Sequence, residues 1–334
     1  MISIKWTSAL LVLASSALIP HKSNAACTSN QVLQPTASFP SLSGRLVYHA
    51  YFGYGDGTSN LYLYDFVAQT NIKLNAASWN ISDPMNAQFS PDGRKLVFMG
   101  KQGGNWNVFV WTIGSAAAPL NLTASIGGRN EDPKFSFDGK RVAFKHEGDV
   151  GFATLAFRGT DVIGVSAWQY GSNNGWATEE SMPYPTPSGK YLLYTIGSTD
   201  SRIYRLNTQT GQSQQLVSTP VGAHDYYPVV RDYSTYFFTR GMAGTGIDQL
   251  MMLMPNVAGN APFTLALNDC NSNNSDIAPV DEDYAVFSSG RYDPPYGLVL
   301  GDLTTGKVWR LSQTAVNIND GKQKLGASYT ITRP

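Results

Sequence analysis

Three histidines and two arginines are the residues best suited to acid–base chemistry in this chain. His49, His146 and His224 each lie in a polar stretch, as do Arg240 and Arg291. A lyase acting on uronic acids needs a base to remove a proton beside the carboxylate, and a cation to neutralise the developing charge. A histidine would be the base and an arginine the cation. The alternative is that each histidine is hydrogen-bonded to an acidic neighbour, as the segments HEGD and AHDYY allow.

Other catalytic and metal-binding patterns are weak. No two histidines form an HxH or HxxxH pair, so a histidine metal site would need residues far apart in the sequence. A glycosidase needs two opposed carboxylates, and no motif singles out such a pair. The chain has no GxSxG motif, and GYGDG lacks the strand-to-helix context of a phosphate-binding loop. If the protein is an enzyme, a polysaccharide lyase therefore fits better than a glycoside hydrolase.

Six acidic residues recur along the chain at similar intervals, although their register drifts by up to about three residues. One hypothesis is a ring of carboxylates that binds a cation such as Ca²⁺ or a basic group of a partner. The alternative, which the commonness of such turns favours, is that each carboxylate accepts backbone N–H bonds and fixes its own loop. No other cofactor is expected. The six residues are Asp83, Asp132, Glu180, Asp225, Asp276 and Asp320.

Aromatic residues in glycine- and asparagine-rich segments predict a binding surface. Tyrosine and tryptophan in such loops stack on sugar rings or hold a peptide, although many of them also serve as packing. Trp106 and Trp176 are flanked by Gly and Asn, so we expect both to be exposed. The candidate ligand-binding residues are Tyr51, Tyr54, Trp106, Trp176, Tyr226, Tyr227 and Tyr292.

A repeat in the sequence shows which elements position these residues. Strand-turn-strand units such as FSPDGRKLVFMG and FSFDGKRVAFKH recur six times, and their aromatic landmarks are separated by 50, 46, 50, 44 and 49 residues. Each unit continues through a polar loop into a third and a short fourth strand, which is the composition of one propeller blade. The landmarks are Tyr48, Phe98, Phe144, Tyr194, Phe238 and Phe287.

The first unit lacks its innermost strand, and the strand-like segment 324–331 follows the last complete unit. We therefore predict an all-β fold: a single six-bladed propeller of four-stranded antiparallel blades, closed by a C-terminal strand that completes blade one. In such blades, the long loops that carry the candidate residues gather on one face. The SPDG turns lie on the opposite face, so we expect Asp92 and Gly93 to have no functional role.

The repeat also carries a family resemblance. SPDGRKLVF and SFDGKRVAF, each preceded by a DP dipeptide, resemble the SPDG-type repeats of TolB-like β-propellers. The resemblance covers most of the chain and weakens in the fifth and sixth units, which have lost the glycine. It implies a propeller that binds a periplasmic or extracellular protein or glycan through its loop-rich face.

The N-terminus predicts export. Lys5, a short apolar run and the small residues of SNAAC have the form of a secretory signal, so residues 1–26 are predicted as a signal peptide and 27–334 as the propeller. In an oxidising compartment Cys27 and Cys270 would form a disulfide. Lipidation of Cys27 is a less favoured alternative, because Asn24 stands where that pattern needs an aliphatic residue.

The overall composition limits the partners. The chain has 334 residues, with 24 Lys+Arg balanced by 24 Asp+Glu, so no net field attracts nucleic acid or an anionic membrane. No later segment is apolar enough to span a membrane. The sequence therefore predicts an exported, periplasmic or secreted module that binds a protein or glycan. The alternative is a carbohydrate-active propeller enzyme acting on an acidic glycan.

Overall fold

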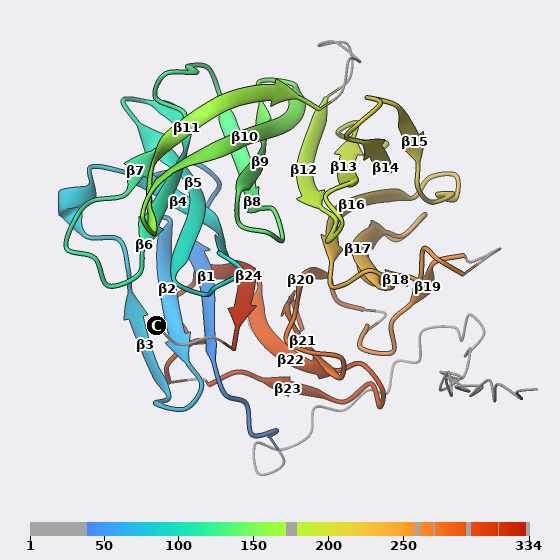
Figure 1. Ribbon diagram of the computed structural model, residues 1–334. Coiled ribbons are helices and arrows are strands. Elements are labelled where there is room, and N and C mark those ends of the chain that lie inside the picture. The colour runs from blue at the N-terminus through green and yellow to red at the C-terminus, as the bar shows by residue number, and fades with distance from the viewer. Residues whose placement is uncertain are drawn as a thin grey trace, which may run out of the picture.

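Six four-stranded antiparallel sheets surround a central axis, as the blades of a propeller (Figure 1). The computed structural model describes residues 39–171, 179–257, 261–269, 271–291, 295–312 and 314–331, and only the backbone of residues 166–168 and 170. Within these ranges the predicted all-β, six-bladed architecture is confirmed. A single 3₁₀ turn, η2 (Ala77–Trp79), lies between blades one and two.

Each blade has an inner, a second, a third and an outer strand, counted from the axis. The inner strands of blades one to six are β24 (Gln323–Thr330), β4 (Ser82–Phe89), β8 (Asn130–Phe135), β12 (Glu180–Pro185), β16 (His224–Val230) and β20 (Asn274–Pro279). The second strands are β1 (Arg45–Tyr51), β5 (Lys95–Gln102), β9 (Arg141–His146), β13 (Tyr191–Ile196), β17 (Tyr236–Gly241) and β21 (Tyr284–Ser289).

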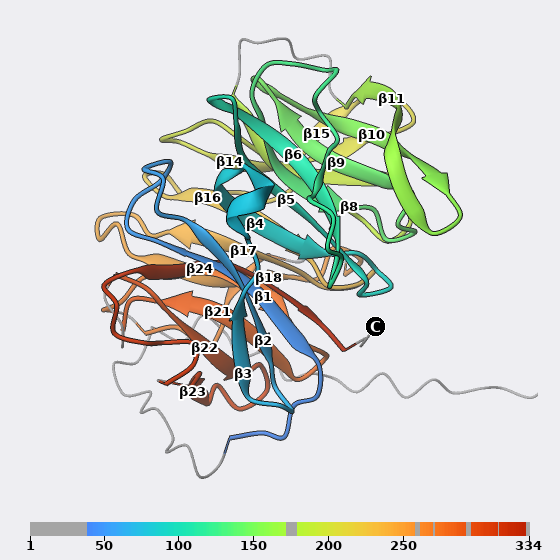
Figure 2. The same cartoon turned by 90° about the vertical axis from the view of Figure 1, so that its left-hand side faces the viewer.

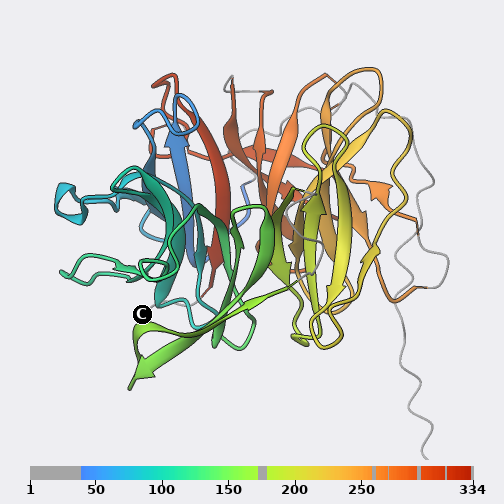
Figure 3. The same ribbon diagram turned by 90° about the horizontal axis from the view of Figure 1, so that it is seen from above.

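The third strands are β2 (Asn60–Asp65), β6 (Asn105–Thr112), β10 (Asp149–Arg158), β14 (Arg202–Asn207), β18 (Asp248–Leu253) and β22 (Gly297–Asp302). The outer strands are β3 (Thr70–Lys73), β7 (Leu120–Asn121), β11 (Asp161–Tyr170), β15 (Ser213–Gln215), β19 (Phe263–Thr264) and β23 (Val308–Arg310). Blade three departs from the expected short fourth strand. Its β10–β11 hairpin is ten residues long on each side and extends past the neighbouring blades (Figures 2 and 3).

The chain end closes the ring in the way the sequence predicts. β24 pairs antiparallel with β1, from Arg45 opposite Thr330 to Tyr51 opposite Gln323. Blade one is therefore built from both ends of the described chain. Closure by a strand removes the open sheet edges that would otherwise be exposed.

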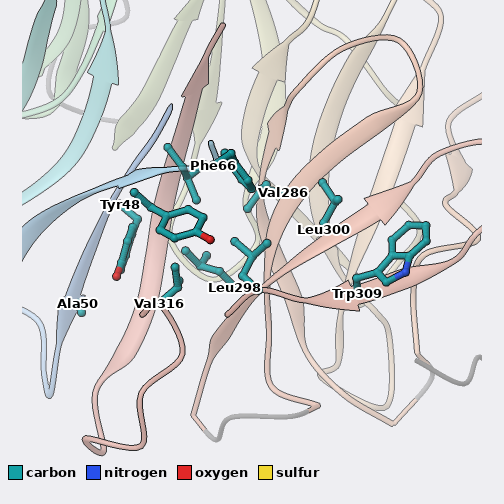
Figure 4. Close-up of a cluster of buried hydrophobic side chains, with 11 residues drawn as sticks. Tyr48, Ala50, Phe66, Val286, Leu298, Leu300, Trp309 and Val316 are labelled. Atoms are coloured by element: carbon teal, nitrogen blue, oxygen red, sulfur yellow. The ribbon is translucent and has the colours of Figure 1, made fainter. Parts of the chain in front are cut away.

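The hydrophobic core is divided into layers between adjacent blades. The layer between blades one and six contains Tyr48 of β1, Leu298 of β22 and Trp309 of β23, and Figure 4 shows the cluster with Tyr48 at one side and Trp309 at the other. All six aromatic landmarks of the repeat are almost fully buried. The repeat was therefore visible in the sequence because each blade needs one large apolar side chain at the same place.

Every inner strand is interrupted by a β-bulge at an equivalent position. The strand register shifts there, and the residue at this position has a positive φ in every inner strand; in β4, Asp83 has one as well. Such a conformation is strained for residues other than glycine and marks a local requirement. We call these residues the bulge ring: Asn86, Asp132, Met182, Tyr227, Asp276 and Gly326.

Backbone N–H groups of the ring explain this requirement. Met182 N donates to Asp132 Oδ2 (3.3 Å), Tyr227 N to Met182 Sδ (3.4 Å) and Gly326 N to Asp276 Oδ2 (3.3 Å). Each bond joins one blade to the ring side chain of the blade before it. The bulges thus turn main-chain donors toward the axis, where they link neighbouring blades.

In the described part of the chain, no helix has the length and apolar character needed to cross a bilayer.

Candidate functional site

The loops of the propeller gather at its two ends. One end, the loop face, carries the loops between second and third strands and the connections between blades. The other, the turn face, carries the turns that join inner to second strands and third to outer strands, including the SPDG turn. Figure 3 shows the strands running between these two ends.

Arg240 is held in a buried ion pair near the loop face. Its Nε lies 2.6 Å from Asp225 Oδ1 and its Nη2 lies 2.8 Å from Asp225 Oδ2. The two residues face each other across β16 and β17, and Thr219 donates a further hydrogen bond to the carboxylate. The Nε and Nη2 donors that would bind a substrate carboxylate are therefore already used within the protein.

The histidines and Arg291 also have internal partners. His49 is buried in β1, with its Nδ1 3.4 Å from the backbone nitrogen of Asn86. Burial, with the ammonium of Lys134 nearby, lowers the pKa of His49 to about 3, so its imidazole is neutral near pH 7. His146 Nδ1 lies 2.9 Å from Asn130 Oδ1. Arg291 Nε lies 3.0 Å from Asp269 Oδ2.

His224 lies at the start of β16 and stacks on Tyr226, with 5.5 Å between ring centroids. It also covers the face of Gly241, where an added Cβ would meet the imidazole at 2.0 Å. The structure thus places the three histidines on blades one, three and five, each packed within its own surroundings rather than in one cluster.

The six predicted acidic residues separate into two sets. Only Asp132 and Asp276 belong to the bulge ring, at the axis. The other four occupy different positions in their blades and contact nearby groups. Asp83 accepts a bond from Gly57 N (2.7 Å), Glu180 from Val150 N (3.0 Å), Asp225 pairs with Arg240, and Asp320 pairs with Lys324 (2.7 Å). No group of three or more His, Cys, Asp or Glu side chains able to hold a metal occurs among the described residues.

Three predicted tyrosines gather above Asp276 at the loop end of the axis. Tyr51 and Tyr227 interact electrostatically with its carboxylate, and Tyr226 lies 5.3 Å from Tyr227 between ring centroids. Tyr226 is also hydrogen-bonded to Asp248. Burial raises the pKa of Tyr51 to about 12 and that of Tyr227 well above its usual value, so these hydroxyls remain neutral.

Tyr54 and Trp106 form a second aromatic group on the loop face. Their ring centroids are 5.3 Å apart, and the ammonium of Lys101 lies 4.8 Å from the indole. The expectation that Trp106 is exposed is wrong: it is only 7% exposed, because it lies in β6 and the loop of blade one covers it. Tyr54 is 54% exposed, and its hydroxyl is hydrogen-bonded to Glu131 in blade three.

A cavity along the axis is a feature that the sequence did not predict. It has a volume of about 280 Å³ and is lined by all six inner strands. Its lining begins at the bulge ring and continues to Pro91, Phe137 and Thr330, beside the turns. This axial cavity therefore extends to the turn face, where the sequence predicted no function.

Comparison with known proteins supports the fold assignment. No model of a protein family matches the sequence, and no curated protein matches it. Among solved structures, TolB from Acinetobacter baumannii is similar with a TM-score of 0.63 and 14% identity, covering 88% of this chain and 68% of that one. The chain has the TolB-like β-propeller fold.

Two further solved structures are similar to this chain in fold. A putative TolB from Agrobacterium tumefaciens gives a TM-score of 0.53 at 17% identity, covering 86% of this chain and 99% of that one. A chain from the nidogen/laminin complex gives 0.59 at 10% identity, covering 87% and 100%. At these identities the TolB-like likeness concerns the fold, and a propeller fold does not by itself determine function.

The bulge ring could have been recognised from the sequence. Each ring residue precedes the first residue of its turn by four positions, as Asn86 precedes Ser90 and Asp132 precedes Ser136. Aligning the repeats on the turns would have placed Asp132 and Asp276 together and left the other four acids out. The remaining predictions, on the signal peptide 1–26, Cys27, Cys270, Trp176 and Tyr292, lie outside the described residues.

Proposed function

We propose that this TolB-like propeller is an exported binding module whose loop face engages a protein partner. The observation that carries the proposal is an exposed aromatic pair on an anchored loop. Phe52 is 56% and Tyr54 is 54% exposed, and both belong to the loop between β1 and β2. Large exposed aromatic side chains are frequent anchors of protein interfaces.

Contacts with blades two and three hold this loop in place. Lys101 Nζ donates to Gly55 O (2.7 Å), and Gly57 N donates to Asp83 Oδ1 (2.7 Å). The Tyr54 hydroxyl reaches Glu131, which is itself paired with Arg129 (2.7 Å). A loop that is ordered before binding loses less conformational entropy on complex formation, so its aromatic side chains contribute more to affinity.

Charge at the same face is consistent with a basic or polar surface on the partner. Asp248 lies beside Tyr226, and a carboxylate next to a tyrosine ring attracts cationic groups. One similar chain comes from a nidogen complex with laminin, which is a protein–protein assembly. That similarity supports the choice of a protein over a glycan as the partner.

The lyase hypothesis receives no such support. Arg240 is enclosed with Asp225, and His49 is a buried neutral imidazole. A general base must reach the substrate proton and have a pKa near the working pH. No pair of the described candidates combines an accessible histidine with an unpaired arginine.

A comparison of two variants tests the proposed function. Phe52→Ala/Tyr54→Ala removes the aromatic pair, and Val67→Ala/Tyr233→Ala is a matched control on the turn face, where Val67 is 59% and Tyr233 is 64% exposed. Immobilised protein is incubated with envelope proteins and with a glycan array. We expect proteins that bind the wild type and the control, and about tenfold weaker binding by the first variant.

Binding only to glycans would favour the glycan alternative. Equal protein binding by both variants would show that the loop face is not the interface. Export is tested separately, by the mature N-terminus of protein isolated from the host. Cleavage after Ala25 or Ala26 is expected, and an intact N-terminus would contradict it.

A further inference from the structure

Three charged side chains meet in the axial cavity without pairing with one another. Lys134 of β8 lines the cavity together with Asp132 and Asp276 and interacts electrostatically with both. Among the described residues, however, no carboxylate oxygen lies within 4.0 Å of Lys134 Nζ, and no hydrogen bond to this ammonium is present. Each of the three side chains is partly exposed, so both signs of charge are available to a ligand in the cavity.

Lys134 differs in this respect from three buried cations of the chain. Arg240 is paired with Asp225, Lys145 with Glu179 (2.8 Å), and Lys324 with Asp320 (2.7 Å). Lys134 is partly exposed to the cavity, and no carboxylate of the described chain is in ion-pair contact with it. Its ammonium is therefore available to an anionic group of a ligand.

The two carboxylates also keep capacity for a ligand. Asp132 accepts from Asn86 Nδ2 (2.8 Å) and, at 3.3 Å, from Met182 N. Asp276 accepts one long bond, from Gly326 N at 3.3 Å. An ionised carboxylate has about four acceptor positions, so both have positions left for an ammonium group.

Neutral groups add a further donor next to Lys134. The Tyr184 hydroxyl accepts a bond from Gln88 Nε2 (3.2 Å), and its own proton has no acceptor within the described chain. Gln88 is fixed in turn, because its Oε1 accepts a bond from Phe135 N (2.7 Å). Tyr184 is therefore positioned to donate to an anionic group in the cavity.

The walls toward the turn face are largely apolar. They include Ala87, Phe89, Ile277 and Ala278, and the exposed ring of Phe137 lies at the mouth. A ligand that fits must therefore have its charged groups at the bulge ring and an apolar part toward the mouth. The volume, about 280 Å³, is close to the lower end of the range of about 300–1,000 Å³ for small-molecule sites.

We propose that the axial cavity binds a small zwitterion, a free α-amino acid or a short peptide, through its mouth on the turn face. The ligand ammonium lies against Asp132 and Asp276, its carboxylate accepts from Lys134 and Tyr184, and its apolar side chain contacts the walls. An anion alone is repelled by the two carboxylates, and a cation alone leaves Lys134 without an anionic partner. This inference does not depend on the proposed function at the loop face.

Calorimetry with three related probes tests the proposal. The probes are leucine, 4-methylpentanoate, which lacks the amine, and 3-methylbutylamine, which lacks the carboxylate. We expect leucine to bind at least about tenfold more tightly than either single-charge probe. Lys134→Met is expected to abolish the advantage of leucine over the amine, and Asp276→Asn its advantage over the acid. Lys140→Met, an exposed lysine beside the same strand, is the matched control and should leave all three affinities unchanged.

Equal affinities for the three probes would overturn the proposal, as would an unchanged leucine affinity in Lys134→Met. Absence of binding by leucine, phenylalanine and glycyl-leucine would also overturn it. If Lys134→Met does not fold, lysine-labelled wild-type protein provides the test by NMR. The Lys134 side-chain signal must then shift on addition of leucine while the Lys140 signal does not.

Discussion

Two groups of charges differ within one fold: Arg240 and Asp225 are buried, whereas Lys134, Asp132 and Asp276 are partly exposed to the axial cavity. Arg240 makes two hydrogen bonds to its carboxylate, at 2.6 and 2.8 Å, directly across a strand pair. Lys134 lies between two carboxylates and is bonded to neither. The first group is internally satisfied, and the second is left open toward a cavity.

The difference shows that, within one propeller, some charges stabilise the fold as ion pairs while others remain able to bind a ligand. Within one blade, the strand register places two charged residues opposite each other, so their ion pair forms when the strands pair. The axis is surrounded by single residues from different blades, and no register aligns their charges for pairing. Groups at the axis are therefore the ones that remain for a ligand.

The largest expected loss of stability comes from removing one partner of the Arg240–Asp225 ion pair. Arg240→Met leaves Asp225 buried without its cation, and losing one partner of a buried ion pair costs about 3–5 kcal/mol. Urea unfolding at pH 7 measures this as a lower midpoint with an unchanged slope. The double variant Asp225→Leu/Arg240→Met is the control and should recover most of the loss. A loss below about 1 kcal/mol in the single variant would show that the pair does not stabilise the fold.

The group of Lys134, Asp132 and Asp276 makes the free energy of unfolding depend on pH. Burial raises the pKa of Asp276 to about 6, so its ionised form is disfavoured in the folded state. Below pH 4 the carboxyl is protonated in both states, and above pH 6 it is ionised in both. Wild-type stability from this group is thus lost as the pH rises from about 4 to about 6.

Asp276→Asn removes this dependence. The free energy of unfolding of the variant, relative to wild type, should increase by on the order of 2 kcal/mol between pH 4 and pH 6.5. Tyr227→Phe retains the carboxyl and should keep the wild-type profile. Parallel profiles for wild type and Asp276→Asn would show that the carboxyl has an ordinary pKa in the folded protein.

The sequence was sufficient to predict the scaffold because each blade repeats the same physical requirements. A buried aromatic such as Phe98 and a tight turn such as Asp92–Gly93 recur in register, and the segment at 324–331 had no partner other than blade one. The cross-strand pair of Asp225 and Arg240 also follows from aligning strands, although the sequence suggested separate roles, Arg240 as a catalytic cation and Asp225 as part of an acidic ring.

Contacts between blades were harder to predict. Tyr54 reaches Glu131, 77 positions later, because a loop of blade one folds across blade two. Asp83 and Asp132 are both acids near the start of an inner strand, yet only Asp132 lies in the bulge ring, because bulges shift the two strands by different amounts. The spacing between the acidic residues does not reveal such shifts, whereas the four-residue distance from a ring residue to its turn does.

An intermediate loss of stability is expected when Lys101, which holds the exposed loop between β1 and β2, is replaced. Lys101 is paired with Asp83 (3.2 Å) and bonded to Gly55 O, and its side chain is partly exposed. Lys101→Met should destabilise the protein by about 1–2 kcal/mol, because a buried carboxylate loses its cation while solvent still reaches the site. Hydrogen exchange should show faster exchange of Gly57 N–H, with Gly93 N–H as the internal reference. Unchanged exchange at Gly57 would show that the loop is held by other contacts.

The smallest effect on stability is expected from Lys134→Met, although it also removes a cation, as Arg240→Met does. Removal of Lys134 relieves the unfavourable enclosure of its ammonium, and it also removes attraction to two carboxylates. These contributions oppose each other, so the change in the free energy of unfolding should stay within about 1 kcal/mol at pH 7. Urea unfolding beside Arg240→Met measures the contrast directly. If Lys134→Met is as destabilising as Arg240→Met, Lys134 is a structural charge like Arg240, and the distinction between satisfied and open charges fails.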